Sequence, residues 1–419
     1  MGKRIVVLTG SHLCHNPRAM KEATALAKVG YDVRILGGWI DPLLKKRDQA
    51  LMTSLPFRYL PVIDITANIT GRTATRFKSK LAGMAHRVGH ENVWQLGHAY
   101  GALRRSAFRE QAELYIAHSE QAMSVAVELL RAGWRAGVDM EDWFSEDLLP
   151  NARRYRPLHL LRSLEKELLT SGVYASCPSH CMSEAVAHEY QCAPPVVIYN
   201  AFHWSERQLL DGSLKDRKNQ KLPSIHWFSQ TLGPGRGLED LFAALPLLRN
   251  LAEIHLRGRP AAGFEQWLRG RVPEIWRDRI FFHDLVSNEE LPSRIAEHDI
   301  GFAGEMTYCR NRDLTVTNKI LQYLSAGLAV VASDTAGQRE VAKQAPDAVR
   351  IYPTGDTSAL ATRIDTLLEL PRILQRAKAA ALQAAEKLYC WERQEGVLLE
   401  AVARVLHRGS SVMGSAIGA

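Results

Sequence analysis

Two cationic residues follow predicted strands at strand-to-helix turns in the second half of the chain. Arg236 lies in the glycine-rich stretch GPGRG, between the strand pattern SIHWFS and a predicted helix that begins at Leu238. Lys319, beside Asn318 in TNKILQYLSAG, lies at the start of another predicted helix. Helix N-termini bind anions through free N–H groups and the helix dipole, and the two side chains add full charges. Two such sites at equivalent turns predict the binding of a diphosphate.

Interpretations of these two residues that involve no ligand stay open. Arg236 is equally typical of a solvated turn, and Lys319 of an ordinary helix surface. A dinucleotide-binding fingerprint explains the turn less well, because Gly233, Gly235 and Gly237 give G-x-G-x-G and not G-x-G-x-x-G.

The first forty residues show the elements that could position a site at strand ends. RIVVLTG, residues 4–10, is a short apolar run typical of a buried parallel strand. Asn16 can cap the helix that follows, Pro17 suits its first position, and Gly30 ends it before the second strand, YDVRIL. This β-α-β unit predicts a doubly wound sheet with its functional crevice beyond the carboxyl ends of the strands.

A second β-α-β pattern begins at Ser224, after the polar stretch 211–223. We expect a turn over QTLGPGRG, helices over 238–248 and 288–296, a helix that starts at Lys319 and stops at Gly327, and strands over 224–229, 252–258, 279–286, 299–304 and 328–333. The restart favours two α/β domains joined by a linker, and one large sheet with an insertion is the alternative.

Composition limits the class of protein. The 419 residues are too many for one compact core, and the formal charge of +8 favours anionic partners without choosing among nucleic acid, phosphorylated substrate and membrane. The six cysteines show no C-x-x-C pair, which predicts a reducing compartment and no structural metal. A strand pattern from Arg4 leaves no room for a signal peptide, and no apolar run approaches a membrane span, so we expect a cytoplasmic protein.

Several motifs resemble those of glycosyltransferases with the GT-B fold, in the large retaining group called group 1 or family 4. They span nearly the whole chain in the expected order: HNPRAMKEATALAKVGYDV, LYIAHSEQA, DMEDWFSED, LEKELL, VIYNAF, SQTLGPGRGLEDL, NKILQYLSAGLAVVAS and AGQREV. The resemblance implies an α/β protein of two Rossmann-like doubly wound domains that face each other across a cleft.

The same resemblance implies the division of the chain. Residues 1–205 would form the acceptor-binding domain, 206–223 a linker and 224–387 the nucleotide-sugar domain. A helix over about 388–408 would cross back to the first domain, and residues 409–419 would be a flexible tail.

Donor-binding residues follow from the resemblance by position. Arg236 matches the basic residue that holds the donor pyrophosphate, and Gly10 with Ser11 matches the loop that faces the donor from the first domain. Gln230 and Thr231 fall near a second phosphate-binding arginine of the family, and neither carries its charge. We therefore expect Lys319 to substitute for the lost cation.

The family's two glutamates, separated by seven residues, are both replaced. Gln322 stands at the second position and can still hydrogen-bond a ribose, with Asn318 beside it on the donor side. Leu314 stands at the first position and cannot bind a hydroxyl. Glu305 is a candidate for the missing carboxylate, unless it pairs with Arg310 or Arg312.

Candidate residues of the first domain lie in three motifs. His118 matches a histidine common at a strand end in the family, where it could reach the sugar or the acceptor, and a buried core histidine is the alternative. Asp142, beside Glu141, could bind acceptor hydroxyls, or the pair could simply begin a helix. His12 and His15 could line the acceptor side of the first loop.

Basic and apolar residues alternate at helical spacing between Arg72 and Arg109, with Glu91 as the one internal acid. This mixture suits an anionic membrane surface or a lipid-diphosphate acceptor. A pair of amphipathic helices with a solvated basic face is an equal alternative, and nucleic acid is a weaker one because no recognition module accompanies the charge.

Together these patterns predict a retaining sugar transferase that uses a nucleotide-diphosphate sugar and a glycan or lipid-linked acceptor. We expect no cofactor and no metal, since preorganised cations can stabilise the leaving diphosphate and that phosphate can accept the acceptor's proton. Surface polysaccharide or glycolipid synthesis, at the inner face of the membrane, is the expected setting. A nucleotide-sugar epimerase and a non-catalytic donor-binding protein are the alternatives.

Overall fold

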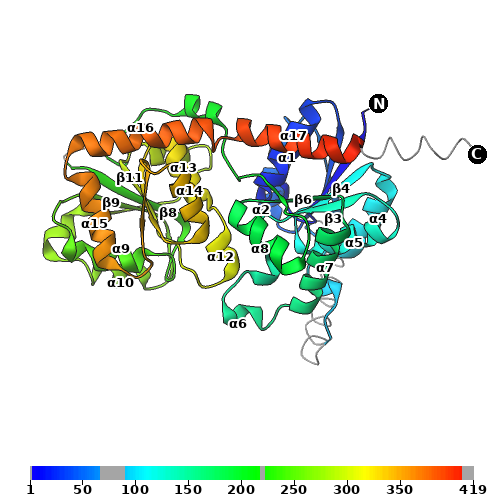
Figure 1. Cartoon of the computed structure of the whole chain (residues 1–419), viewed down its shortest axis with the longest axis horizontal. Helices are drawn as coiled ribbons and strands as arrows, with labels where there is room; N and C mark the ends of the chain where they lie inside the picture. Colours follow the sequence, from blue (N-terminus) through cyan, green and yellow to red (C-terminus); the bar gives the residue numbers. More distant parts are fainter. Residues whose placement is uncertain (1, 67–89, 218–221, 408–419) are drawn as a thin grey trace, which may run out of the picture. The chain divides into compact units, whose positions relative to one another are not determined.

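The computed structural model describes residues 2–66, 90–217 and 222–407. The chain forms two compact units, each built on its own parallel sheet (Figure 1). The first unit comprises residues 1–178, 182–198 and 395–419, and the second comprises 179–181 and 199–394. No helix in the described parts of the chain combines the length and the apolar character that crossing a membrane requires.

The first unit contains a seven-stranded sheet in the order β3-β2-β1-β4-β5-β6-β7, with all neighbours parallel. The chain builds outward from β1 to β3 and then returns to place β4 beside β1. Such a reversal leaves a crevice at the carboxyl ends of β1 and β4. The strands are β1 (Arg4–Leu8), β2 (Asp32–Trp39), β3 (Arg58–Asp64), β4 (Leu114–Ala117), β5 (Ala136–Asp139), β6 (Tyr174–Cys177) and β7 (Val196–Val197).

Amphipathic helices flank this sheet (Figure 1). In the first of them, Ala19, Ala23 and Leu26 are buried at helical spacing, as the sequence pattern requires. The helices are α1 (Pro17–Lys28), α2 (Pro42–Met52), α4 (Tyr100–Glu110), α5 (Glu120–Arg131), α6 (Pro150–Arg153), α7 (Leu158–Ser171), α8 (His180–Tyr190) and α17 (Trp391–His407), whose residues from Glu395 belong to the first unit.

The second unit repeats the same plan with six parallel strands in the order β10-β9-β8-β11-β12-β13. Its chain reversal lies between β8 and β11. The strands are β8 (Ser224–Leu232), β9 (Glu253–Pro260), β10 (Ile280–His283), β11 (Ile300–Ala303), β12 (Ala329–Ser333) and β13 (Val349–Tyr352). The helices are α9 (Leu238–Ala244), α10 (Phe264–Arg269), α11 (Leu291–Ala296), α12 (Arg310–Leu314), α13 (Asn318–Ala326), α14 (Ala336–Gln344), α15 (Thr357–Leu368) and α16 (Pro371–Lys387). The prediction of two doubly wound parallel sheets is confirmed.

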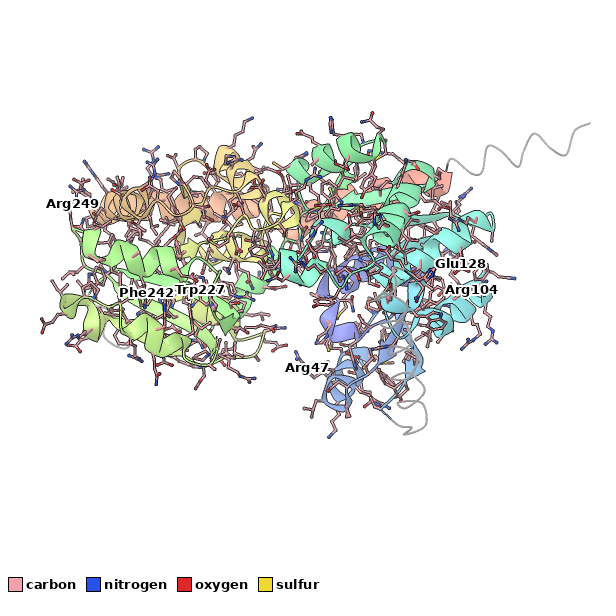
Figure 2. The ribbon with its side chains drawn as sticks, turned by 90° about the horizontal axis from the view of Figure 1, so that it is seen from below. Arg47, Arg104, Glu128, Trp227, Phe242 and Arg249 are labelled. Carbon is pink, nitrogen blue, oxygen red and sulfur yellow. The ribbon has the colours of Figure 1, made fainter. Side chains whose placement is uncertain are left out.

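Both faces of the second sheet are covered, so its central strands β11 and β12 are mainly apolar. Ile300 and Phe302 of β11 pack into a core with α9, α10 and α15, and Figure 2 shows Trp227 and Phe242 together in that core. Val330 and Ala332 of β12 pack into a second core with α13 and α14. The alternation follows from the two-residue period of a strand.

Four local predictions were wrong. Gln230 and Thr231 continue strand β8 and do not belong to the turn. The helix predicted over 238–248 ends at Ala244 and continues as a 3-10 turn that contains Pro246, and the one predicted over 288–296 starts at Leu291. Asn16 occupies the cap position of α1, but its side chain bonds within the preceding loop and leaves the helix end uncapped.

A cluster of four histidines lies near the amino-terminal half of the second sheet. His226 and His255 are opposite one another on β8 and β9, and the ring of His226 stacks on that of His298 at 4.4 Å. The Nδ1 of His255 lies 2.9 Å from the Nε2 of His283. Asp216, from the polar segment before β8, approaches the Nδ1 of His283 at 3.4 Å, so this part of the expected linker is docked against the sheet.

The environment favours the neutral form of all four rings. Burial lowers the pKa of His255 to about 2 and that of His298 to about 4, and it lowers the pKa values of His226 and His283 as well. The facing charges are the cations Arg217 and Arg257, which lower these values further, and the anions Asp216, Glu253 and Asp284. Protonation in the folded state is therefore opposed.

This cluster predicts that the second unit loses stability in mild acid. An unfolded histidine has a pKa near 6.5, so below that pH the unfolded chain binds more protons than the folded chain. Each neutral histidine then costs about 1.4 kcal/mol of unfolding free energy per pH unit. Urea unfolding measured between pH 7.5 and 5 should show this slope, and His226→Phe, which replaces a ring whose nitrogens have no hydrogen-bond partner among the described residues, should reduce it.

His188→Phe, at an exposed position of α8, is the matched control and should keep the wild-type slope. A wild-type unfolding free energy that does not change between pH 7 and 5 would contradict the interpretation.

Candidate active site

The loop between β8 and α9 carries Arg236 at the carboxyl edge of the second sheet. Gly235 and Gly237 adopt left-handed backbone angles, with φ of 72° and 78°, that favour glycine. The Arg236 side chain is exposed, and its Nη1 donates to Ser229 Oγ at 3.1 Å. The guanidinium is thus held at the strand end while most of its donors face solvent, as anion binding requires.

A glycine contact joins this loop to the one after β11. A Cβ on Gly237 would lie 2.7 Å from Gly304 Cα, so only two glycines can approach so closely. Arg236 and Glu305 adjoin these glycines in the chain. The structure therefore brings the Arg236 loop and the Glu305 loop to the same edge of the sheet.

Lys319 and Glu305 form an ion pair at this edge. The Lys319 Nζ lies 2.7 Å from Glu305 Oε1, and both side chains are 12% exposed. The same Nζ lies 5.2 Å from the centre of the Trp227 ring, within the range of a cation–π contact. Lys319 is in the first turn of α13, whose cap residue Thr317 makes no side-chain cap hydrogen bond. Free N–H groups and a positioned ammonium therefore lie together.

The other predicted donor residues of this unit lie at different depths. Gln230 and Thr231 are exposed at the end of β8, and the strand register puts Arg259 of β9 opposite Thr231. The sequence analysis missed Arg259, although it stands at a strand end in HLRGRP. Asn318 accepts a hydrogen bond of 3.0 Å from Asn200.

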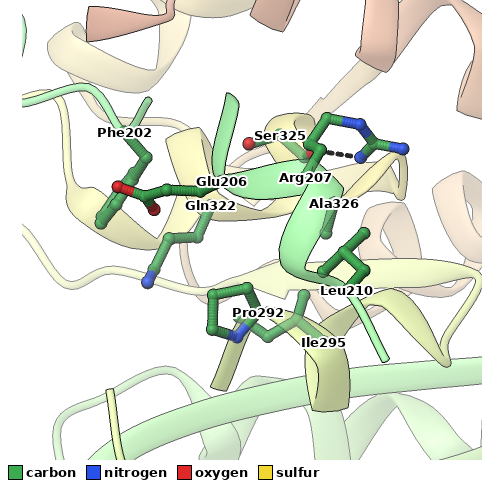
Figure 3. Close-up of a pocket in the computed structure, with 9 residues that line it drawn as sticks. All are labelled: Phe202, Glu206, Arg207, Leu210, Pro292, Ile295, Gln322, Ser325 and Ala326. Atoms are coloured by element: carbon green, nitrogen blue, oxygen red, sulfur yellow. Dashed lines mark hydrogen bonds between the residues drawn. The ribbon is translucent and has the colours of Figure 1, made fainter. Parts of the chain in front are cut away.

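Gln322 lines a small pocket within the second unit (Figure 3). Its side chain points into the space between α13, α11 and the 3-10 segment Trp204–Leu209 (Figure 3). Arg207 closes one side and donates to the Ser325 carbonyl. The full lining is Phe202, Glu206, Arg207, Leu210, Pro292, Ile295, Gln322, Ser325 and Ala326. An amide in a largely apolar pocket could bind a polar group such as a ribose hydroxyl.

Gly10 and Ser11 follow β1 in the first unit. Gly10 has a φ of 67°, and a Cβ there would lie 2.5 Å from the Gln121 amide nitrogen, which itself donates to the Gly10 carbonyl at 2.9 Å. The Ser11 carbonyl accepts from the Tyr59 hydroxyl at 3.0 Å. Asn16 donates to Ser11 Oγ at 2.8 Å, which explains why it does not cap α1. The loop is held in one shape at the sheet's reversal point.

The two histidines of this loop, His12 and His15, differ in their exposure to solvent. His12 is 3% exposed, its Nδ1 is 2.8 Å from Asp48, and its Nε2 accepts from the backbone N–H groups of Ile40 and Asp41. Both ring nitrogens are therefore occupied, and His12 is placed to hold the loop rather than to contact a ligand. His15 is exposed and stays a candidate for the acceptor side.

His118 is fully buried in an ionic cluster beneath the strand ends. Its Nε2 lies 3.2 Å from Glu22, and its Nδ1 lies 3.9 Å from Asp139. Arg18 completes the cluster with bonds of 2.8 and 2.7 Å to the two oxygens of Asp139. Ser176 also donates to Asp139, at 2.6 Å. The geometry matches the buried alternative considered for His118.

Glu22, His118 and Asp139 are also the one group of potential metal ligands that the described residues bring together. The guanidinium of Arg18 is bonded to Asp139 and lies 3.4 Å from Glu22. A metal ion here would therefore face a fixed cation. We interpret the group as an ion network, and the expectation of a metal-independent reaction stays a prediction.

The protonated ring of His118 offsets negative charge in this cluster. Burial opposes the charged ring, but Glu22 and Asp139 outweigh it and raise the pKa of His118 to about 9. Burial and the neighbouring Asp139 raise the pKa of Glu22, and His118 and Arg18 are the cations that favour its charged form. Burial also raises the pKa of Glu141, which follows β5 and is partly exposed, to about 7. Its neighbour Asp142 is likewise partly exposed, so both acids stay candidates for the acceptor side.

The basic stretch is described only in part, because residues 72–89 lie outside the described residues. In α4, Arg104 pairs with Glu128 of α5, and Figure 2 shows the two side chains next to each other. The Arg104 guanidinium also lies 5.2 Å from the centre of the Phe108 ring. In α4 the arginines Arg104, Arg105 and Arg109 are exposed while Leu103 and Ala107 are buried, so this part of the stretch is an amphipathic helix with a basic outer face.

The comparisons with known proteins agree with this architecture. Residues 223–370 match the family model for glycosyl transferases group 1. No curated protein matches the sequence as a relative.

Solved structures match over nearly the whole chain. Sucrose-phosphate synthase from Thermosynechococcus elongatus is 14% identical, with a TM-score of 0.69 over 97% of this chain and 100% of that chain. Anabaena Alr3699/HepE in complex with UDP and glucose is 15% identical, with a TM-score of 0.69 over 96% and 100%. A UDP-forming trehalose-phosphate synthase from Burkholderia xenovorans is 13% identical, with a TM-score of 0.66 over 97% and 99%. At these identities the likeness defines the fold.

The fold is GT-B, and residues 223–370 form a group 1 glycosyltransferase domain. The chain is therefore an enzyme of the glycosyltransferase class.

The His118 cluster predicts a stability effect that is separate from catalysis. Because the folded pKa is about 9 and the unfolded pKa is near 6.5, the stabilisation is complete below pH 6.5 and is lost as pH rises through 9. His118→Gln leaves buried carboxylates short of one cation and should lower the unfolding free energy by about 3–5 kcal/mol. Urea unfolding at pH 7 and 9.5 measures both effects.

The control is His15→Gln, at an exposed position of the same unit, which should unfold like the wild type. A His118→Gln protein that keeps wild-type stability but loses activity would show instead that His118 acts on substrate.

Proposed function

We propose that this enzyme transfers a sugar, with retention, from a nucleotide-diphosphate sugar to a glycan or lipid-linked acceptor, without a metal. The observation that carries the proposal is the grouping of Arg236, Lys319 and Glu305 on two touching loops and one helix start at the edge of the second sheet. One carboxylate and two cations there fit a sugar hydroxyl and a diphosphate.

Electrostatic stabilisation of the leaving group explains how these residues accelerate transfer. The anomeric bond breaks with oxocarbenium character, and negative charge gathers on the diphosphate. Arg236, Lys319 and the free N–H groups of α13 are fixed before the reaction, so they stabilise that charge without reorganising. The leaving phosphate can then accept the acceptor's proton on the same face of the sugar.

A uridine nucleotide is the first donor to test. The HepE structures contain UDP-glucose in one case and UDP in another, and the fold of this chain is the same. Gln322, in its pocket, is the residue that we assign to the ribose. We assign Gly10 and Ser11 of the first unit to donor binding. We assign His15 and Asp142 to acceptor binding.

Donor binding should depend on the two cations. Arg236→Ala and Lys319→Ala should each weaken the binding of UDP-glucose, or of the best donor in a nucleotide-sugar panel, by tenfold or more, which is about 1.4 kcal/mol. Isothermal titration measures this affinity. Arg249→Ala, at an exposed arginine of the same unit that pairs with Asp365, is the matched control and should bind normally.

Unchanged affinity in Lys319→Ala would remove Lys319 from the donor site. The reaction products test the rest of the proposal. Release of free nucleotide that needs acceptor indicates transfer, an altered sugar on the same nucleotide indicates isomerisation, and binding without turnover indicates a protein that only holds the donor.

We further propose that the enzyme works at an anionic membrane surface, in surface polysaccharide or glycolipid synthesis. The support is the basic and apolar composition of residues 72–109 and the net charge of +8.

Flotation with vesicles of anionic lipid at low salt should recover the protein with the lipid. Replacing Arg72, Arg76, Lys78 and Lys80 by glutamine should abolish flotation, because each basic residue near the surface contributes about 1 kcal/mol. Arg376→Gln, which removes an exposed cation of the second unit that is paired with Asp347, is the control and should still float. No recovery of the wild type at low salt would contradict membrane attachment.

A further inference from the structure

The buried hydroxyl of Ser333 holds the backbone of Glu305. Ser333 is the last residue of β12 and is fully buried. Its Oγ accepts from the Glu305 N–H at 2.7 Å and donates to the Glu305 carbonyl at 2.7 Å. One side chain therefore satisfies both backbone groups of a loop residue.

Gln338 fixes the hydroxyl in turn. This residue of α14 is fully buried, and its Nε2 donates to both the Oγ and the carbonyl of Ser333 at 2.9 Å. A serine hydroxyl has one donor and two acceptor positions. With the N–H of Glu305, the amide of Gln338 and the carbonyl of Glu305, all three are used, so the hydroxyl has one orientation.

The neighbouring contacts restrict the backbone of Glu305 further. Gly304, the residue before it, packs against Gly237 so closely that a Cβ on Gly304 would lie 3.1 Å from Gly237 Cα. The Glu305 side chain extends from this fixed point, and its Oε1 accepts from Lys319 at 2.7 Å. Buried polar groups in a loop are costly unless they are fully bonded, and this loop achieves it with side chains from β12 and α14.

We propose that Ser333 and Gln338 are positioning residues for recognition of the donor sugar. They fix Glu305 so that one carboxylate oxygen holds Lys319 and the other accepts a hydrogen bond from a sugar hydroxyl. This inference rests on the proposed function, since it concerns the sugar half of the same donor. It assigns Glu305 to the sugar and leaves the diphosphate to Arg236 and Lys319.

The test compares a nucleotide sugar with the nucleotide alone. In Ser333→Ala, kcat/KM for UDP-glucose, or for the best donor of the panel, should fall tenfold or more, while the affinity for UDP should change less than threefold. Ser224→Ala is the matched control. Ser224 is an equally buried serine, bonded to Asp299 and His298, and it lies at the amino-terminal end of β8, on the opposite edge of the same sheet. It should leave both quantities near the wild-type values.

A double-mutant cycle shows whether Ser333 acts through Glu305. Glu305→Gln should reproduce the loss, and adding Ser333→Ala to it should cause little further change, because the two residues act as one unit. Gln338→Leu, which keeps the volume and removes the bonds to Ser333, should give a smaller loss of the same kind. It also serves as the second variant if Ser333→Ala does not fold.

The possible results separate the two claims. Equal losses of UDP and donor affinity in Ser333→Ala, or an effect no larger than that of Ser224→Ala, would overturn the positioning role and leave the proposed function in place. Additive losses in the cycle would also overturn it. A wild-type protein that binds neither nucleotides nor nucleotide sugars would overturn the proposed function together with this inference.

Discussion

The candidate donor site depends on a contact between two glycine backbones. Gly237 and Gly304 lie so close that a side chain on either would push their loops apart. Gly237 also has a left-handed φ of 78°, so glycine is favoured for a second reason. The loops carry Arg236 and Glu305 directly beside the contact. Charged side chains on exposed loops are usually mobile, but here the backbone that carries them is fixed before any ligand arrives.

The buried ionisable groups of the two units differ in charge state. In the first unit, Arg18 and His118 face Asp139 and Glu22, so the cluster keeps its charges and pairs them. In the second unit, four histidines lie among arginines and stay neutral. Burial penalises a charge in both places. At His118 the carboxylates of Glu22 and Asp139 outweigh burial, whereas at the four histidines Arg217 and Arg257 add to it and the neighbouring carboxylates do not offset the sum. The same residue type is therefore a structural cation in one unit and a neutral packing ring in the other.

The approximate positions of strands and helices, and the doubly wound class of the two sheets, could be predicted from the sequence because they depend on local periodicity and on turn residues. The positions of single side chains could not. His118 stands at a strand end, as the resemblance implies, yet its burial depends on Arg18 and Glu22, which are about a hundred residues away in the chain. His12 is occupied by Asp48 for the same reason. Gly304 and Ser333 carried no signal of their own, since a close approach between loops and a hydroxyl bonded to a distant backbone arise only from the tertiary fold.

The two departures from the family's pattern are explained best as one change. The sequence lacks a carboxylate at Leu314 and a cation at Gln230 or Thr231. The structure places Glu305 and Lys319 as a bonded pair at this edge of the sheet, and Arg259 opposite Thr231. A second cation beside Arg236 without a counter-charge would repel it in the free enzyme, and the Glu305 carboxylate offsets that repulsion. Under the proposed function, a bound diphosphate would bring its own negative charge, and the second carboxylate oxygen of Glu305 would accept from a sugar hydroxyl while the first stays on Lys319. The pair thus keeps the charge balance of the site with and without donor, which neither residue could do alone.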